Sequence, residues 1–235
     1  RSCADFASVN QVIRSLNTES PPHIVAFDLP GFASSPPPSE RCGTPWYAEC
    51  VIHAIEEYLD EVGRELPVII VGHSFGGRVA VQIGSGPVPF DLTHIVLTGV
   101  PLYRPDVVPP PSRSYQLIRS LAQLHLVSER TLERYRRKYG SRDYIEAQGV
   151  MRGVFVETVN ESYTSQLRAI EVPVTLAWGT GDTTTRIALA ERALGDLRKG
   201  TLVSFEGVGH LVPTEAPEML AKVIIKSVGA GGVTK

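Results

Sequence analysis

One serine of this chain lies between two glycines in a pattern that suits a nucleophile. The segment Gly72-His73-Ser74-Phe75-Gly76 follows an apolar β-branched run and precedes small residues. This order predicts a strand that turns sharply into a helix, with Ser74 at the turn. Such a turn strains the serine backbone, and side chains at Gly72 or Gly76 are expected to collide with neighbouring backbone. The Ser74 hydroxyl would then project at the N-terminus of the helix, where the Phe75 N–H could stabilise an oxyanion.

A serine hydroxyl is a weak nucleophile and needs a base, which in turn needs a carboxylate to orient it. Asp182 stands at the tip of a glycine-rich turn after an apolar run, and His210 stands in a glycine-rich loop after another. The carboxyl ends of parallel strands meet at one edge of a sheet. We therefore predict that Ser74, Asp182 and His210 form a catalytic triad in this chain order. Asp106 also follows a strand-like run and is an alternative acid.

The elements that must position these residues alternate along the chain. Apolar runs predict strands at residues 23–28, 66–71, 92–97, 172–178 and 201–205, and helical spacing predicts helices at residues 4–16, 44–61, 75–83, 184–197 and 214–225. Thr44 is expected to be an N-cap, and Gly63 is expected to end the same helix. Continuous apolar strands that alternate with helices indicate an α/β fold, in which helices cover both faces of a mostly parallel sheet.

One stretch interrupts this alternation. Residues 104–170 show helical patterns but no convincing strand, and they open with several prolines. We therefore predict a core of residues 1–103 and 171–235 and a helical cap of residues 104–170, inserted after the third recognisable strand. Arginine and lysine are frequent between residues 113 and 142. We interpret them as a solvated helix face, with a funnel for an anionic substrate or a docking surface as the alternative.

Composition excludes several classes of protein. The chain has 235 residues, of which 43% are hydrophobic and 20% charged, and its formal net charge is −2. These values are ordinary for a globular protein, and they leave no basic surplus for nucleic acid or an anionic membrane. No apolar run approaches the roughly 20 residues that span a bilayer. We therefore expect a small-molecule substrate, no nucleic-acid partner and no membrane insertion, while the oligomeric state stays open.

Cysteine and histidine usage bears on compartment and cofactors. Three cysteines, Cys3, Cys42 and Cys50, are an odd number and do not indicate a disulfide framework in a chain of this length. Cys42 and Cys50 could pair, but a reducing compartment explains three unpaired thiols at least as well, so we expect a cytoplasmic protein. The histidines outside the predicted triad show no metal-ligand spacing, and no phosphate-binding or dinucleotide-binding loop is present. We expect neither a metal nor a cofactor.

Four segments of the chain resemble the α/β-hydrolase superfamily, in particular its cap-bearing branch of esterases, carbon–carbon bond hydrolases and related enzymes. The segments are FDLPGF at residues 27–32, VGHSFGG at 71–77, AWGTGD at 177–182 and GVGHLVPTEAPE at 207–218. The resemblance covers nearly the whole chain and is weakest in the predicted cap. It implies Ser74 as nucleophile, His210 as general base and then acid, and Asp182 as its orienting partner. A serine nucleophile argues against the haloalkane dehalogenase and epoxide hydrolase members, which use aspartate.

The resemblance also implies a missing part. In related enzymes a strand and a His-Gly-type loop precede the first major helix, and that loop supplies a second oxyanion N–H. Residues 4–16 already look like this helix, so we expect an N-terminally incomplete chain. The alternative is that the strands at residues 23–28 and 66–71 pair directly in a rearranged sheet.

The expected activity is a serine hydrolase that cleaves a small or medium carboxylic ester, thioester or lactone through an acyl-enzyme. Phe75 is expected in the oxyanion hole, and His73 and Leu211 are expected to line the substrate pocket. Two enzymatic alternatives use the same triad, namely carbon–carbon bond hydrolysis and acyl transfer. The alternative from another class is a non-catalytic, ligand-binding member of the fold.

Overall fold

A computed structural model describes residues 2–16, 22–63, 65–104 and 149–231, with isolated positions between 118 and 147. These residues belong to two compact units. The first contains residues 1–37, 43–103 and 162–235, and the second contains residues 38–42 and 104–161. Ser74, Asp182 and His210 all belong to the first unit.

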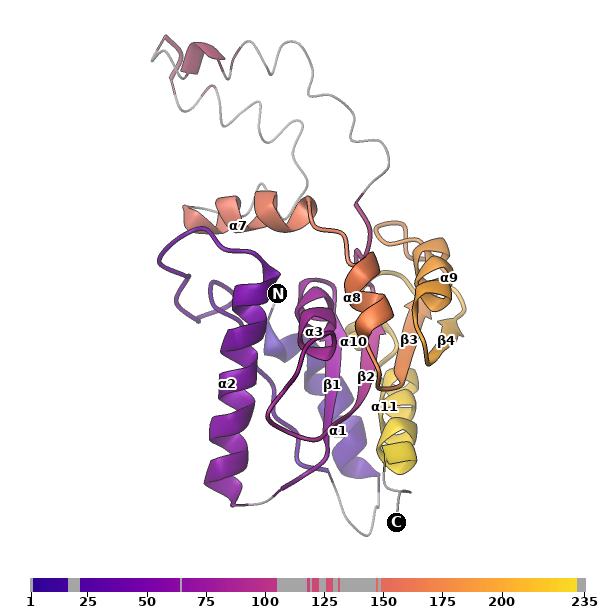
Figure 1. Ribbon diagram of the computed structural model, residues 1–235. Helices are drawn as coiled ribbons and strands as arrows, with labels where there is room; N and C mark the ends of the chain where they lie inside the picture. The colour runs from indigo at the N-terminus through magenta and orange to yellow at the C-terminus, as the bar shows by residue number, and fades with distance from the viewer. Residues whose placement is uncertain are drawn as a thin grey trace. The chain divides into compact units, whose positions relative to one another are not determined.

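Strands and helices alternate through most of the first unit (Figure 1). In chain order its elements are η1 (Cys3–Phe6), α1 (Ala7–Ser15), α2 (Thr44–Val62), β1 (Val68–His73), α3 (Phe75–Gly84), β2 (Leu92–Thr98), α8 (Thr164–Ala169), β3 (Val174–Gly179), α9 (Ile187–Asp196), β4 (Gly200–Phe205), α10 (Val212–Glu215) and α11 (Pro217–Gly231). The four strands pair in parallel in the order β1-β2-β3-β4. The predicted α/β fold with a parallel sheet is confirmed.

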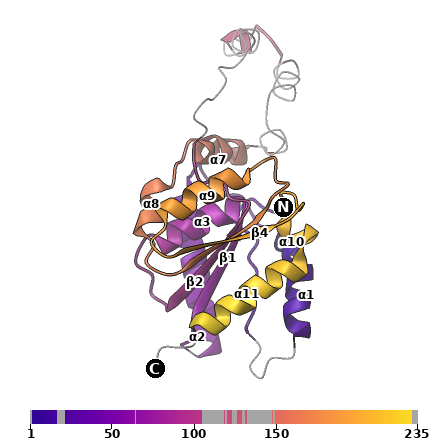
Figure 2. The same cartoon turned by 90° about the vertical axis from the view of Figure 1, so that its right-hand side faces the viewer.

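Helices cover both faces of this sheet, with α1 and α11 on one face and α3, α8 and α9 on the other (Figure 2). Alternate residues of a strand point to opposite faces. Leu97 and Leu176 therefore pack in the cluster under α3, α8 and α9, whereas Val96 and Ala177 pack in the cluster under α1 and α11. Two buried clusters hold the strands from both sides, so the carboxyl ends of the strands form a rigid edge.

Helix α2 shows how local signals set the ends of an element. Pro45 stands in the first turn, where its missing N–H is not needed, and Gly63 ends the helix in left-handed backbone with φ of 60°. The N-cap is Gly43, in extended backbone, and Thr44 is already the first helical residue. The prediction of Thr44 as N-cap is therefore wrong by one residue. The Thr44 hydroxyl instead lies 3.1 Å from the buried Tyr163 hydroxyl.

The predicted strand at residues 23–28 is wrong. Residues 22–29 form no regular element, and among the described residues β1 pairs with β2 alone, so the alternative of direct pairing with residues 66–71 is also not observed. Side-chain contacts hold this segment instead. The Cys3 N–H donates to Asp28 Oδ1 at 2.6 Å, and His23 Nδ1 lies 2.9 Å from the Tyr58 hydroxyl. A β-like pattern is local, whereas a strand needs a neighbouring edge to bond to.

The helix predicted at residues 214–225 consists of two helices. α10 ends at Glu215 and α11 begins at Pro217, with Ala216 between them in non-helical backbone. Proline lacks the N–H that would continue the first helix, and it is well suited to the first turn of the next.

The second unit contains α7 (Val150–Val159), and Arg41 forms an ion pair with Glu157 of this helix. α8, which falls inside the predicted 104–170 insertion, belongs to the first unit, where Leu167 is fully buried. Asp106 and all the arginines and lysines between residues 113 and 142 lie outside the described residues. No helix in the described part of the chain is long and apolar enough to cross a membrane.

Candidate active site

Ser74 occupies the turn between β1 and α3 in a conformation that few residues adopt. Its φ is 52° and its ψ is −115°, and Ala33 is the one other described non-glycine residue with positive φ. The Ser74 N–H donates to the Thr98 carbonyl of β2 at 3.0 Å, which ties the turn to the next strand. Left-handed backbone costs a side chain of this kind about 1–3 kcal/mol, and such strain is characteristic of functional sites.

Two glycines make room for this turn, and one of them differs from our expectation. A Cβ at Gly72 would lie 2.6 Å from the Gly77 Cα, so a side chain there collides with backbone as predicted. A Cβ at Gly76 meets nothing within 4 Å, so the expected collision at Gly76 is wrong. Gly77 is the constrained position, since its Cβ would lie 2.2 Å from a Val100 methyl. β1 and α3 therefore approach each other closely at Gly72 and Gly77, which lie on either side of the serine along the chain.

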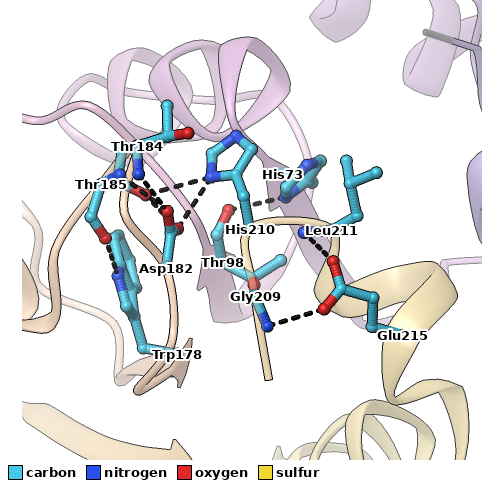
Figure 3. A network of polar contacts seen from close by, with 10 residues as sticks. All are labelled: His73, Thr98, Trp178, Asp182, Thr184, Thr185, Gly209, His210, Leu211 and Glu215. Carbon is cyan, nitrogen blue, oxygen red and sulfur yellow. Dashed lines mark hydrogen bonds and ion pairs between the residues drawn. The ribbon is translucent and has the colours of Figure 1, made fainter. Parts of the chain in front are cut away.

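Asp182 is buried, and donors surround its carboxylate (Figure 3). The N–H groups of Thr184 and Thr185 both donate to Oδ1 at 2.8 Å. The Thr185 hydroxyl donates to Oδ2 at 2.5 Å, and His210 Nδ1 lies 2.7 Å from the same oxygen. Burial alone would raise the pKa of this carboxyl, but the hydrogen bonds from Thr185 and His210 outweigh burial and lower the pKa below its ordinary value.

The loops that carry Asp182 and His210 approach each other closely. A Cβ at Gly179 would lie 2.2 Å from the Val208 carbonyl oxygen, and the Gly181 N–H donates to that carbonyl at 2.9 Å. On β3, the buried Trp178 donates its indole N–H to the Thr185 carbonyl at 2.7 Å. The glycines allow the approach and the tryptophan anchors the turn, so the acid and the histidine meet although 28 residues separate them.

His210 is held in one tautomer. A carboxylate only accepts hydrogen bonds, so Nδ1 carries the proton and Nε2 keeps its lone pair on the opposite side of the ring (Figure 3). The side chain is 12% exposed. Glu215 fixes the loop on both sides of the histidine, because its carboxylate accepts the N–H of Gly209 at 2.6 Å and that of Leu211 at 3.1 Å. The ring can therefore take a proton at Nε2 while Asp182 stabilises the charge.

His73 lies beside this pair. Its Nδ1 donates to the Thr98 carbonyl at 3.0 Å, and its buried ring lies 5.1 Å from the His210 ring, measured between centroids. Leu211 follows His210, and 39% of its surface is exposed.

The structure thus joins Asp182 to His210 and places Ser74 at the same edge of the sheet. The Ser74 N–H and His73 Nδ1 share the Thr98 carbonyl, and His73 contacts His210. The described residues show no hydrogen bond between the Ser74 hydroxyl and His210. Such bonds are often long without substrate and tighten in the substrate complex. Among the described residues, no group of three His, Cys, Asp or Glu side chains could hold a metal ion.

Three residues of this site were missed by sequence reasoning, namely Thr185, Glu215 and Gly99. Glu215 stands in one of the segments that carry the family resemblance, which is the one signal that could have marked it. Thr185 lies three residues after Asp182, but its contact with His210 spans 25 residues. Gly99 lies against the rings of His73 and His210, which are distant in the chain, so no local pattern identifies it.

Comparison with known proteins agrees with this geometry. This chain belongs to the alpha/beta hydrolase family, whose model matches residues 5–223. It is 24% identical over 225 residues to the uncharacterized hydrolase YugF of Bacillus subtilis (strain 168), a match that covers 86% of this chain and 78% of that protein.

Two solved structures show the same fold. A meta-cleavage product hydrolase from Pseudomonas fluorescens IP01 is 15% identical, with a TM-score of 0.66, and the match covers 98% of this chain and 86% of that one. A thermophilic esterase from Thermogutta terrifontis is also 15% identical, with a TM-score of 0.65 and the same coverage of 98% and 86%. At these identities the likeness extends to the fold and not to the substrate.

Proposed function

We propose that this protein is a serine hydrolase that cleaves small or medium carboxylic esters, thioesters or lactones through an acyl-enzyme. The observation that carries the proposal is the Asp182–His210 hydrogen bond of 2.7 Å at the sheet edge where Ser74 adopts a φ of 52°. A buried carboxylate that fixes a histidine tautomer beside a strained serine is the arrangement that acyl transfer needs. No metal or cofactor enters the proposal.

In the first half of the reaction, Ser74 Oγ attacks the substrate carbonyl carbon while His210 Nε2 takes the hydroxyl proton. The carbonyl oxygen becomes an oxyanion that the Phe75 N–H stabilises. His210 then gives the proton to the leaving alcohol or thiol as its bond to the carbonyl carbon breaks. In the second half, His210 removes a proton from water, the hydroxide attacks the acyl-enzyme, and Ser74 leaves with that proton.

The residues around Ser74 favour an apolar acyl group. The Phe75 ring lies 5.0 Å from the Phe32 ring and 5.0 Å from the Tyr47 ring, between centroids. We propose that these rings, together with His73 and Leu211, line the pocket for the acyl group. A pocket of aromatic and aliphatic side chains with few polar groups is typical of small-molecule sites.

A fluorophosphonate probe tests the proposal, because it reacts covalently with activated serines. We expect the wild-type protein to be labelled, Ser74→Ala to be unlabelled, and the exposed-serine control Ser34→Ala to be labelled like wild type. His210→Ala should lower ester turnover by about 10³-fold or more with the fold retained by circular dichroism. A folded wild-type protein that is not labelled would contradict the proposal and favour a ligand-binding member of the fold.

Substrate screening separates the enzymatic alternatives. We expect turnover of p-nitrophenyl esters of graded chain length, with a preference for apolar acyl groups. The likeness to the meta-cleavage product hydrolase makes carbon–carbon bond hydrolysis the second candidate, since the same triad serves both reactions. Turnover of a vinylogous diketone with no turnover of esters would favour that candidate, and acyl transfer to an added alcohol would favour a transferase.

A further inference from the structure

Thr185 is a buried residue that contacts both partners of the Asp182–His210 pair. Its side chain is nearly inaccessible, with 1% of the residue exposed. Its hydroxyl donates to Asp182 Oδ2 at 2.5 Å, and the same oxygen lies 3.3 Å from His210 Nδ1 (Figure 3). None of the proton transfers proposed above involves the Thr185 hydroxyl.

The two carboxylate oxygens of Asp182 have different donors. Backbone N–H groups saturate Oδ1, and any residue at positions 184 and 185 except proline would supply them. Oδ2 accepts from the Thr185 hydroxyl and from His210. The Thr185 hydroxyl is therefore the side-chain donor that holds Oδ2 of Asp182 on the side of the imidazole. This hydrogen bond also stabilises the negative charge of the buried carboxylate.

Thr185 is itself held in place. Its N–H and its hydroxyl donate to the same carboxylate, and its carbonyl accepts the Trp178 indole N–H at 2.7 Å. A β-branched side chain also has few χ1 choices. The position of the hydroxyl is thus set by three hydrogen bonds and the backbone, so it can orient its neighbours without moving.

The hydroxyl also bears on the tautomer of His210. Its single proton is directed to Asp182, so its lone pairs face His210 Nδ1 and can accept only if Nδ1 carries a proton. The Nδ1–H is then shared between Asp182 Oδ2 and Thr185 Oγ1. Thr185 disfavours the other tautomer, in which Nδ1 would be a bare acceptor facing a carboxylate.

We propose that Thr185 is a positioning residue, whose hydroxyl aligns the Asp182 carboxylate and keeps His210 in the tautomer that leaves Nε2 able to accept a proton. The proposal rests on the function proposed above. Besides Asp182, His73 contacts the His210 ring, and the Glu215 carboxylate accepts two N–H groups of the His210 loop. Substitution of Thr185 removes none of these three ionisable groups.

The test replaces the hydroxyl without changing the shape of the side chain. Thr185→Val removes it, Thr185→Ser restores it, and Thr183→Val makes the same change at an exposed neighbour. Ester kinetics are measured for each variant. We expect Thr185→Val to lower kcat by about 10–100-fold with KM within about twofold, because alignment and not binding is lost.

The Asp182 carboxylate gives the sign. Without the hydroxyl, Asp182 stays buried but loses a donor, so its pKa should rise. This pKa is read from the ¹³C chemical shift of the labelled carboxyl as a function of pH, and Thr185→Ser and Thr183→Val should keep the wild-type value. A Thr185→Val enzyme that loses only stability, with kcat and this pKa unchanged, would reduce Thr185 to a packing residue and overturn the proposal. Thr185→Ala, which leaves room for a water, replaces the valine variant if that variant does not fold.

A second readout does not depend on turnover. In ¹⁵N-labelled wild-type protein, His210 Nδ1 should show the signature of a protonated, slowly exchanging nitrogen. Thr183→Val should keep this signature, whereas the Nδ1 proton of Thr185→Val should exchange faster with solvent. Identical Nδ1 spectra in wild type and Thr185→Val would refute the positioning role even in an active enzyme. If the wild-type protein reacts with neither the probe nor esters but the Nδ1 signals differ as expected, the proposed function fails and the positioning of the pair stands.

Discussion

At the scale of single residues, Gly99 shows how closely the site is packed. It follows β2 with a φ of 58°, a conformation that side chains rarely adopt. A Cβ at this position would lie 3.0 Å from His73 Cε1 and 3.1 Å from both His210 Cε1 and Nδ1. Glycine is therefore required at position 99 for two reasons, the backbone conformation and the space taken by the two imidazole rings.

Gly99→Ala should lower both stability and activity. The left-handed backbone costs about 1–2 kcal/mol of unfolding free energy for a side chain. The His210 ring must also shift by a few tenths of an ångström, which should lower kcat by about 10-fold. Gly207→Ala is the matched control, because Gly207 has a φ of 70° and a Cβ there meets nothing within 4 Å. Urea unfolding and ester kinetics separate the two effects, and an equal loss of kcat in both variants would exclude ring displacement as the cause.

At the scale of elements, the four-residue helix α10 positions the loop before it. Glu215, at its end, accepts the N–H groups of Gly209 and Leu211 on either side of His210. A Cβ at Gly209 would lie 2.8 Å from Glu215 Oε2, so the glycine is what lets the carboxylate approach. The helix break before Pro217 ends α10 at Glu215. The end of this helix therefore places the carboxylate that holds the His210 loop.

Glu215→Ala should reduce kcat by about 10-fold, because the loop loses its charged acceptor and His210 is less well placed. Water can reach these exposed N–H groups, so the unfolding free energy should fall by only about 1 kcal/mol. Glu218→Ala removes an exposed carboxylate three residues on and should change neither quantity. The two variants are compared by steady-state kinetics and urea unfolding. Equal kcat in Glu215→Ala and wild type would show that the loop holds its shape without the carboxylate.

At the scale of the whole molecule, one polar cluster joins three segments on the face of the sheet that carries α8 and α9. The Tyr103 hydroxyl donates to Asp196 Oδ2 at 2.9 Å, and Arg168 of α8 bonds Oδ1 at 2.8 and 2.9 Å. The Arg192 guanidinium lies 3.9 Å from the centroid of the Tyr103 ring. Burial alone would raise the pKa of Asp196, but Tyr103 and Arg168 outweigh it, so the pKa is lowered.

The sign of this shift predicts how stability depends on pH. A carboxyl whose pKa is lower in the folded than in the unfolded state stabilises the fold above its ordinary pKa, and this contribution disappears as pH falls through the folded value. Arg168 is 67% exposed, so solvent weakens the ion pair and Asp196→Asn should cost about 1 kcal/mol at pH 7. The difference from wild type should shrink in unfolding measurements near pH 3. Asp91→Asn changes an exposed carboxylate outside this cluster and serves as the control.

The sequence by itself determined the parts of this protein that depend on neighbours along the chain. Apolar runs and glycines predicted the parallel α/β fold, the turn at Ser74, and the positions of Asp182 and His210 beyond two strand ends. These signals are local because periodicity and backbone freedom are properties of short segments.

Only the tertiary structure decided what depends on residues far apart in the chain. Residues 23–28 have the pattern of a strand but pair with no strand among the described residues, and Gly77, not Gly76, is the glycine that close packing requires. The hydroxyl of Thr185 and the ring space beside Gly99 matter because loops from different strands meet there. Hydrogen-bond partners and steric neighbours of this kind are set by packing, which no local pattern specifies.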